Sequence, residues 1–373
     1  MDGHAFLLGA DMIGALTRTL DNWLGRGEAA VTVPPFDGAL RPNRRLDEAQ
    51  ARFPLDQVDC IAVVGNELVA SAGSAIYARD ANGAWQLRGS YTTAIACIAA
   101  IGTDGLAIAL ADGEIVVKGG AFDGRHYRAG DGIWCITALA ASGTDLFVAN
   151  GSAMNAASDW QRDLLERNAS GSIWRLDLKT GESTRIVGGL AFPAGLAVDS
   201  ASLVYSEAWK HRLVRIDLAN PAKQQTLYAD MPGYPGRISP AADGHWLAVF
   251  APRSQLVEFV LREPAYRKRM LAEVPQPFWV APNLRAGRSF YEPLQGGGVK
   301  HLGILKPWAP TMSAGLCVKL DGAFRPVFSL QSRADGATHG VTSVAEHLGQ
   351  MFAAARGDGV VISIPLANLG DEA

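Results

Sequence analysis

Four side chains in this sequence are the first candidates for moving protons or holding an anion. Asp59, Glu207 and His339 are titratable groups that could serve as a general acid or base. Arg237, in the segment MPGYPGRIS, carries a planar guanidinium that can grip a carboxylate or a developing oxyanion. A site that unites Asp59, His339 and Arg237 would hold an acid–base pair beside an anion-binding cation. We therefore expect Asp59, His339 and Glu207 as catalytic residues and Arg237 as a ligand-binding residue.

Some of these candidates have simpler structural alternatives. Glu207 lies in YSEAWKHR, where it could instead pair across strands with a basic neighbour such as Lys210 or Arg212. His301 follows a triple glycine in GGGVKHLGILKPW and is a further ligand-binding candidate. A lone histidine is more often a hydrogen-bonded structural residue than a functional one, and that alternative holds for His301 and His339 alike.

A recurring phrase identifies the elements that must position these side chains. CIAVVGNELVAS begins at Cys60, CIAAIGTDGLAIAL at Cys97 and CITALAASGTDLFVAN at Cys135. Related phrases begin at Gly195, Arg237 and Ser343, so the spacings are 37, 38, 60, 42 and 106 residues. Each phrase predicts three short strands separated by turns, and a period of roughly 40 residues is typical of a propeller blade. Six units predict an all-β, six-bladed β-propeller in which the cysteines fill one structural position of successive blades.

The irregular spacings predict insertions into this propeller. We expect an N-terminal amphipathic helix over 1–28 and the propeller over 29–368, with insertions near 151–171 and 264–312. The first insertion contains a short amphipathic segment, DWQRDLLERN, and the second a predicted helix, PAYRKRMLAEV. The segment AAVTVPPF at 29–36 could supply the outer strand of the last blade, which would close the ring and remove an exposed sheet edge.

Ligands of propellers bind at a mouth of the central channel, where the innermost strands converge. The residue before each phrase is the rim candidate, which gives Asp59, Ala96, Trp134, Ala194, Gly236 and Thr342. Only Asp59 and Thr342 offer side-chain oxygens, too few for a tight calcium site. We add Trp134, Thr342 and Asn150, the last at the start of the first insertion, to the ligand-binding candidates.

Three segments resemble strictosidine synthase-like proteins. They are FPAGLAVDSASLVYSEAWKHRLVRIDL (192–218), MPGYPGRIS (231–239) and GVTSVAEHLGQMFAAARGDGVVISI (340–364). This family belongs to a superfamily of six-bladed propellers that includes gluconolactonases and paraoxonases, and the resemblance covers most of 30–366. It implies an ester or lactone hydrolase, or a condensing enzyme that forms a C–N linked product.

The departures from the family pattern narrow these activities. Metal-dependent relatives carry Glu at the first rim position, Asn at the third and fourth, and Asp-Asn in the fifth unit. This chain has Asp59, Trp134, Ala194 and Gly236-Arg237 there, so the resemblance disfavours calcium and implies no other cofactor. The condensing enzymes use a Glu in the last blade, where this chain has Thr342, so strictosidine synthesis itself is disfavoured.

The net charge and the N-terminal segment limit which partners and which cellular location the protein can have. The net charge of −3 predicts no nucleic-acid partner. The N-terminus lacks the basic start of a signal peptide and is too interrupted by charges to span a bilayer, which predicts a cytoplasmic protein. Its apolar residues recur at every fourth position: Leu8, Met12, Leu16, Leu20 and Leu24. The helix packs on the propeller, contacts a membrane surface peripherally, or forms a homodimer contact.

Three functions remain open from the sequence. The first is a metal-independent enzyme that hydrolyses or condenses a small organic molecule at the channel mouth. The alternative is a non-catalytic propeller that binds a small-molecule ligand or another protein. The third is a calcium-dependent lactonase or esterase with a rebuilt site.

Overall fold

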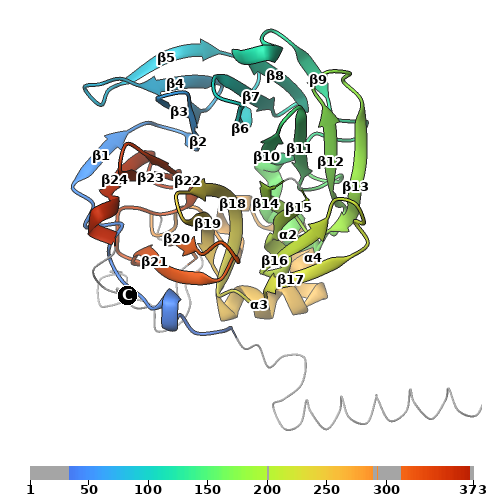
Figure 1. The fold of residues 1–373 in the computed structure, drawn as a ribbon. Helices are drawn as coiled ribbons and strands as arrows, with labels where there is room; N and C mark the ends of the chain where they lie inside the picture. The colour runs from blue at the N-terminus through green and yellow to red at the C-terminus, as the bar shows by residue number, and fades with distance from the viewer. Residues whose placement is uncertain (1–32, 200, 289–291, 293–311, 370–373) are drawn as a thin grey trace, which may run out of the picture.

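The computed structural model describes residues 33–199, 201–288, 292 and 312–369. These residues form six four-stranded antiparallel sheets arranged as a ring around a common axis, which confirms the six-bladed β-propeller (Figure 1). The predicted N-terminal helix over 1–28 lies outside the described residues. Within them, no helix combines the length and the apolar character needed to cross a bilayer.

Each blade is a meander of four strands, numbered here from the innermost outward. Blade 1 has β2 (Val58–Val64), β3 (Glu67–Ala72), β4 (Ala75–Arg79) and β5 (Trp85–Ser90); blade 2 has β6 (Ile95–Ile101), β7 (Gly105–Leu110), β8 (Glu114–Lys118) and β9 (His126–Arg128). Blade 3 has β10 (Ile136–Ser142), β11 (Asp145–Asn150), β12 (Gly171–Asp177) and β13 (Ser183–Leu190); blade 4 has β14 (Pro193–Val198), β15 (Ser202–Glu207), β16 (Arg212–Asp217) and β17 (Gln224–Tyr228). Blade 5 has β18 (Gly233–Ala241), β19 (Gly244–Pro252), β20 (Gly315–Leu320) and β21 (Pro326–Ser332); blade 6 has β22 (Val341–His347), β23 (Gln350–Ala355), β24 (Val360–Pro365) and β1 (Ala51–Pro54).

The ring is closed by a strand from the N-terminal side of the chain, although not by the predicted one. β1 pairs antiparallel with β24, with Ala51 opposite Ser363. The prediction of 29–36 was wrong for the part that the structure describes, since residues 33–36 form no strand. Pro34 and Pro35 explain this, because proline has no N–H to donate to a sheet ladder.

The hydrophobic core lies between neighbouring blades. In one cluster, Ile98 and Ile108 of blade 2 pack with Ile136 and Val148 of blade 3. The innermost strands are rich in small residues; β6 reads IACIAAI, for example. Small side chains near the axis allow six strands to converge, and larger apolar side chains fill the wider gaps further out.

Two insertions interrupt blades 3 and 5. Residues 151–170 separate β11 from β12 and contain α2 (Trp160–Glu166). Residues 253–314 separate β19 from β20 and contain α3 (Gln255–Arg262) and α4 (Pro264–Glu273). Short 3₁₀ turns complete the described elements: η1 (Gly38–Leu40), η2 (Gly120–Phe122), η3 (Ala157–Asp159), η4 (Ala208–Lys210), η5 (Gln276–Phe278) and η7 (Leu366–Leu369).

Helix α3 corrects the prediction of a third strand in the phrase that begins at Arg237. Its apolar residues Leu256, Val257, Val260 and Leu261 recur at helical spacing, and they pack in one cluster with Leu165 of α2. The third strand of blade 5 is β20, which follows the insertion.

The prediction that the three cysteines fill one structural position of successive blades is confirmed for only two of them. Cys60 and Cys97 occupy equivalent places on β2 and β6, opposite Ser71 and Ala109. Cys135 precedes β10, and the equivalent residue of blade 3 is Ala138, opposite Ala149. Because most residues from Ile136 to Ala141 are apolar, the repeat of blade 3 was aligned three residues too early. The rim residue of blade 3 is therefore Thr137, and the prediction of Trp134 was wrong.

Candidate functional site

Every innermost strand carries a β-bulge at the same depth in the propeller. In five blades one residue is skipped by the pairing with the second strand, and in β18 the ladder jumps from Pro235 to Ile238. The bulge residues are Asp59, Ala96, Thr137, Ala194, Gly236, Arg237 and Thr342. A bulge frees a backbone group from the ladder and re-aims it. The structure thus builds a ring of backbone groups that the sheet ladders leave unpaired at one level of the channel.

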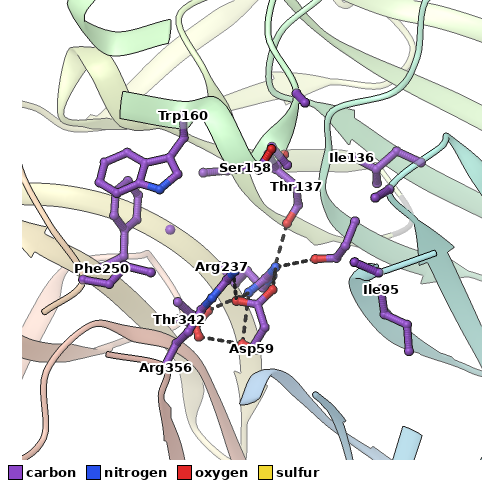
Figure 2. A pocket seen from close by; sticks show the side chains of 18 of the residues that line it. Asp59, Ile95, Ile136, Thr137, Ser158, Trp160, Arg237, Phe250, Thr342 and Arg356 are labelled. Carbon is purple, nitrogen blue, oxygen red and sulfur yellow. Dashed lines mark hydrogen bonds and ion pairs between the residues drawn. The ribbon is translucent and has the colours of Figure 1, made fainter. Parts of the chain in front are cut away.

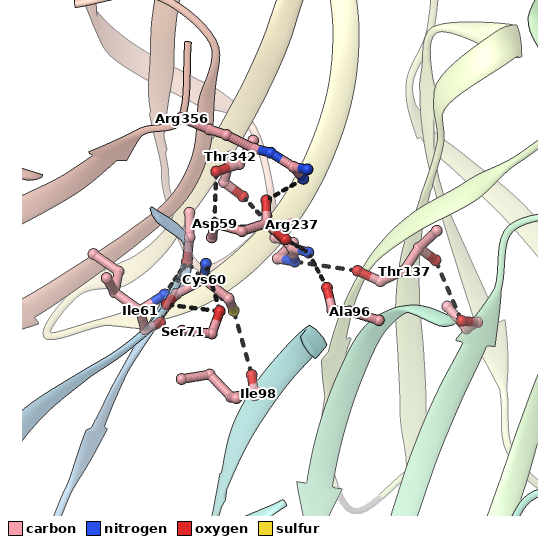
Figure 3. Close-up of polar contacts among 12 residues, drawn as sticks. Asp59, Cys60, Ile61, Ser71, Ala96, Ile98, Thr137, Arg237, Thr342 and Arg356 are labelled. Atoms are coloured by element: carbon pink, nitrogen blue, oxygen red, sulfur yellow. Dashed lines mark hydrogen bonds and ion pairs between the residues drawn. The ribbon is translucent and has the colours of Figure 1, made fainter. Parts of the chain in front are cut away.

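The guanidinium of Arg237 lies inside this ring (Figure 3). Its Nε donates to the carbonyl oxygen of Thr137 at 3.1 Å, and Nη2 donates to that of Ala96 at 2.8 Å. Nη1 donates to the carbonyl oxygens of Asp59 and Thr342, each at 3.2 Å. The carboxylate of Asp59 completes the set, with Oδ2 at 2.8 Å from Nη2 and Oδ1 at 3.3 Å from Nη1. All three guanidinium nitrogens are thereby engaged.

The charge of Asp59 is fixed by two guanidiniums. Its side chain is 10% exposed and accepts a second ion pair from Arg356, whose Nη1 lies 3.1 Å from Oδ1. Burial alone raises the pKa of the Asp59 carboxyl, but Arg237 and Arg356 more than offset this and lower it to about 2. Asp59 is therefore ionised at neutral pH and is a weak base.

A cavity of about 210 Å³ opens above this ion pair. Figure 2 shows Trp160 and Phe250 on one side of it and Ile95 and Ile136 on the other, with Arg237 and Asp59 between them. Trp160 and Phe250 meet edge to face with ring centroids 5.4 Å apart. We call Trp160, Phe250 and the third aromatic lining residue, Phe192, the aromatic wall.

Helix α2 holds the aromatic wall in place through a buried carboxylate. Asp163 is fully buried, and its Oδ1 accepts a hydrogen bond from Nε1 of Trp209 at 2.7 Å. Trp209 stacks on Phe192 with ring centroids 4.3 Å apart and also contacts Trp160. The first insertion therefore contributes one rigid side of the cavity.

A second cavity of about 310 Å³ lies further along the channel. Its lining consists mainly of residues that follow the bulges on the six innermost strands, such as Ile61, Ile98 and Val344, with His245 of β19 and Arg237 in addition. Arg237 lines both cavities, so this residue lies between them.

Three of the predicted site residues meet at the cavity. Asp59, Arg237 and Thr342 all line it, although they come from blades 1, 5 and 6. The hydroxyl of Thr342 donates to the carbonyl oxygen of Asp59 at 2.6 Å, so Thr342 ties blade 6 to blade 1.

The other two predicted catalytic residues lie elsewhere. His339 is fully buried, with Nδ1 at 2.9 Å from Oγ of Ser313 and Nε2 at 2.7 Å from the carbonyl oxygen of Arg333. Glu207 is also fully buried; it accepts the N–H of Ala191 and pairs with Arg212. Neither side chain lines the cavity, so the expected pairing of Asp59 with His339 is absent from the described site.

The remaining ligand-binding candidates do not line the cavity either. Asn150 is buried, where it accepts the N–H of Cys135 and donates to the carbonyl oxygen of Ser152. Trp134 is 48% exposed, outside the cavity lining. His301 lies outside the described residues.

The sequence analysis did not identify Arg356 as a site residue, and it did not place the aromatic wall beside it in one cavity. Arg356 follows β23, the second strand of blade 6, and Ala111 follows the second strand of blade 2; both line the cavity. The residue just after each second strand is therefore a second rim position. The repeat pattern could have pointed to Arg356 in this way.

The calcium site of the metal-dependent propellers does not fit the residues at this mouth. The oxygens that face the axis already surround the Arg237 guanidinium, whose positive charge opposes a metal ion at the same place. In the described part of the chain, no group of three or more His, Cys, Asp or Glu side chains is placed to hold a metal.

Comparison with known proteins supports the family resemblance over part of the chain. No protein-family model matches the chain. Strictosidine synthase-like 13 of Arabidopsis thaliana is 32% identical over 108 residues, which are 28% of this chain and 27% of that protein. The chain therefore matches little more than a quarter of this relative's length. This match confirms the resemblance to strictosidine synthase-like proteins.

Several solved structures are similar to the chain at low sequence identity. The luciferin-regenerating enzyme has a TM-score of 0.48 at 12% identity, covering 83% of this chain and 86% of that one. The calcium-binding protein regucalcin from Agrobacterium tumefaciens also has a TM-score of 0.48 at 12% identity, covering 90% and 95%. A chain of a nidogen/laminin complex has a TM-score of 0.41 at 15% identity, covering 52% and 72%.

Proposed function

We propose that the cavity at the channel mouth binds a small organic anion with an apolar ring, without a metal ion. The observation that carries this proposal is Arg356, a guanidinium at the cavity whose side chain is 47% exposed. Among the described residues its one polar partner is Asp59, so most of its N–H groups are free for a ligand.

The charge of the lining favours an anion. Its charged residues are two arginines, Arg237 and Arg356, and one aspartate, Asp59, which leaves a net charge of +1. Because Arg237 and Asp59 neutralise each other, the excess charge lies on Arg356. An arginine binds a carboxylate through two parallel hydrogen bonds, which fixes orientation as well as charge.

The size and polarity of the cavity favour a ring-bearing ligand. Its volume of about 210 Å³ lies below the ~300–1,000 Å³ of sites for drug-sized molecules, so it suits one or two rings. The aromatic wall offers a flat apolar face to such a ring. Ser158, which is exposed in the lining, offers one hydroxyl for a further hydrogen bond.

Binding without catalysis ranks first because the lining holds no effective base. Asp59 is its one carboxylate among the described residues, and a pKa of about 2 makes it a poor proton acceptor at neutral pH.

A metal-independent hydrolase or condensing enzyme of the strictosidine synthase-like type is the second candidate. Arg356 favours it, since an exposed guanidinium at the cavity could stabilise the oxyanion formed when an ester or lactone is attacked by water.

Calorimetric titration with matched ligands tests the proposal. We expect benzoate, phenylacetate or indole-3-acetate to bind, and the neutral benzamide to bind more weakly. Arg356→Ala should lower carboxylate affinity ~10–100-fold, because a charged hydrogen bond contributes about 1.5–3 kcal/mol. Arg325→Ala is the matched control, since Arg325 is an exposed arginine paired with Asp321 outside the cavity.

The same ligand panel separates the two candidates. Equal affinity for carboxylates and amides, or no effect of Arg356→Ala, would overturn the proposed anion site. Turnover of phenyl esters or lactones that persists with a chelator and falls in Arg356→Ala would establish the second candidate instead.

A further inference from the structure

Four innermost strands of the propeller, those of blades 1, 2, 3 and 6, meet at one side chain of blade 5, Arg237. We propose that its guanidinium is a tethered cation, occupying an oxygen cage that would otherwise bind a metal ion and locking the blades together at the axis. This inference does not depend on the ligand proposed for the mouth.

The oxygen atoms that accept hydrogen bonds from the guanidinium are those of a hard-cation site. Four are the backbone carbonyl oxygens of Asp59, Ala96, Thr137 and Thr342, and two are the carboxylate oxygens of Asp59. We call these six atoms the oxygen cage. Calcium takes six to eight such oxygens, mixing carboxylates with backbone carbonyls. The cage therefore has the chemistry of a calcium site, although a guanidinium fills it.

The fit between the cage and the guanidinium is close. The six donor–acceptor distances run from 2.8 to 3.3 Å and use Nε, Nη1 and Nη2. One carboxylate balances the single charge of Arg237. A covalently attached cation cannot dissociate, so the cage stays filled whatever metal is present.

The remaining blade is joined through the neighbouring residue. Oγ of Ser206 in blade 4 donates to the carbonyl oxygen of Gly236 at 2.8 Å. A side chain on Gly195 of blade 4 would clash with that same carbonyl group, so the two strands pack backbone to backbone. Gly236 and Arg237 together thus contact all five other blades, at sequence separations of up to 178 residues.

A second buried ion pair provides the matched comparison. Arg212 pairs with the fully buried Glu207 through Nη2 at 2.6 Å, and Nε donates to the same carboxylate. No backbone carbonyl accepts from Arg212 in the described structure, so its removal leaves a carboxylate without a cage. Lys210 remains beside that carboxylate.

The experiment removes each guanidinium and offers calcium in its place. Thermal unfolding and calorimetric titration would be measured for wild type, Arg237→Ala and Arg212→Ala after chelator treatment. Calcium would be added up to about 10 mM, above the ~1 mM dissociation constants of weak calcium modules. We expect no calcium effect on wild type. Arg237→Ala should lose roughly 5–10 °C in Tm and regain about 3 °C or more with calcium.

The control and a second variant make the outcome decisive. Arg212→Ala should lose stability without any recovery in calcium. Calcium binding by wild type, or an Arg237→Ala protein that gains nothing from calcium, would overturn the proposal. If Arg237→Ala does not fold, Arg237→Lys decides. It keeps the charge with fewer donors, so a lower Tm insensitive to calcium supports the cage, and wild-type Tm refutes it.

Discussion

Two arginines contact the same carboxylate of Asp59, yet they belong to different regions of the molecule. Arg237 is 16% exposed, and every guanidinium nitrogen is bonded to the oxygen cage. The side chain of Arg356 is 47% exposed, and its guanidinium has one polar partner among the described residues. The first joins blades, whereas the second faces the cavity.

The difference shows that residue type alone does not define a binding group. A buried guanidinium must have all its donors satisfied, because an unpaired buried charge is costly. Such a residue has no capacity left for a ligand. The sequence-based role of Arg237 as a ligand-binding residue therefore stays a prediction, and the contacts that Arg237 already makes argue against it.

The largest expected effect on the free energy of unfolding comes from removing the carboxylate of the oxygen cage. Asp59→Ala would leave Arg237 buried without its counter-ion, which typically costs about 3–5 kcal/mol. Urea unfolding followed by tryptophan fluorescence would measure this free energy. A loss below about 1 kcal/mol would mean that the backbone carbonyls alone hold the guanidinium.

Acid titration gives the next effect, because the pKa of Asp59 is lowered from 3.8 to about 2. A carboxylate with a lowered folded-state pKa contributes stability that is complete above its ordinary value and disappears as the pH falls towards the folded value. The contribution is on the order of 2 kcal/mol, lost between about pH 4 and pH 2. Asp59→Asn should show a correspondingly shallower loss over that window. If the free energy of unfolding of wild type and of Asp59→Asn falls equally over this pH range, the stabilising role of the ionised Asp59 is contradicted.

The smallest effect should come from the exposed arginine. Arg356→Ala removes an ion pair that solvent screens, so the free energy of unfolding should change by about 0–1 kcal/mol. The same variant should still lose carboxylate binding. Unfolding measurements in urea check the first statement, and a loss comparable to that of Asp59→Ala would erase the distinction between the two arginines.

Much of the fold could be predicted because the repeat is local in sequence. Each blade is a meander of adjacent strands, so short phrases such as those at Cys60 and Cys97 reveal it directly. The closing strand and the third strand of blade 5 were misplaced, because both pair only after a long excursion of the chain.

The site could be predicted only in part, because its contacts cross the ring. Asp59 and Thr342 were found as rim positions of two repeats, and Arg237 was found as the residue directly after the rim position Gly236; none of this required knowledge of side-chain direction. His339 lies three residues before Thr342 but is fully buried away from the cavity, where Ser313 and the carbonyl oxygen of Arg333 hold its ring. Nearness in sequence did not predict that orientation.

The position of Arg237 between the two cavities also has a kinetic meaning. A ligand bound at the mouth as proposed would meet the hydrogen-bonded guanidinium of Arg237, since Arg237 also lines the second cavity further along the channel. Under that proposal, the ligand would enter and leave on the side of the cavity that Arg356 and Trp160 line. We then expect strictly competitive exchange, in which one ligand must leave the cavity before the next can enter.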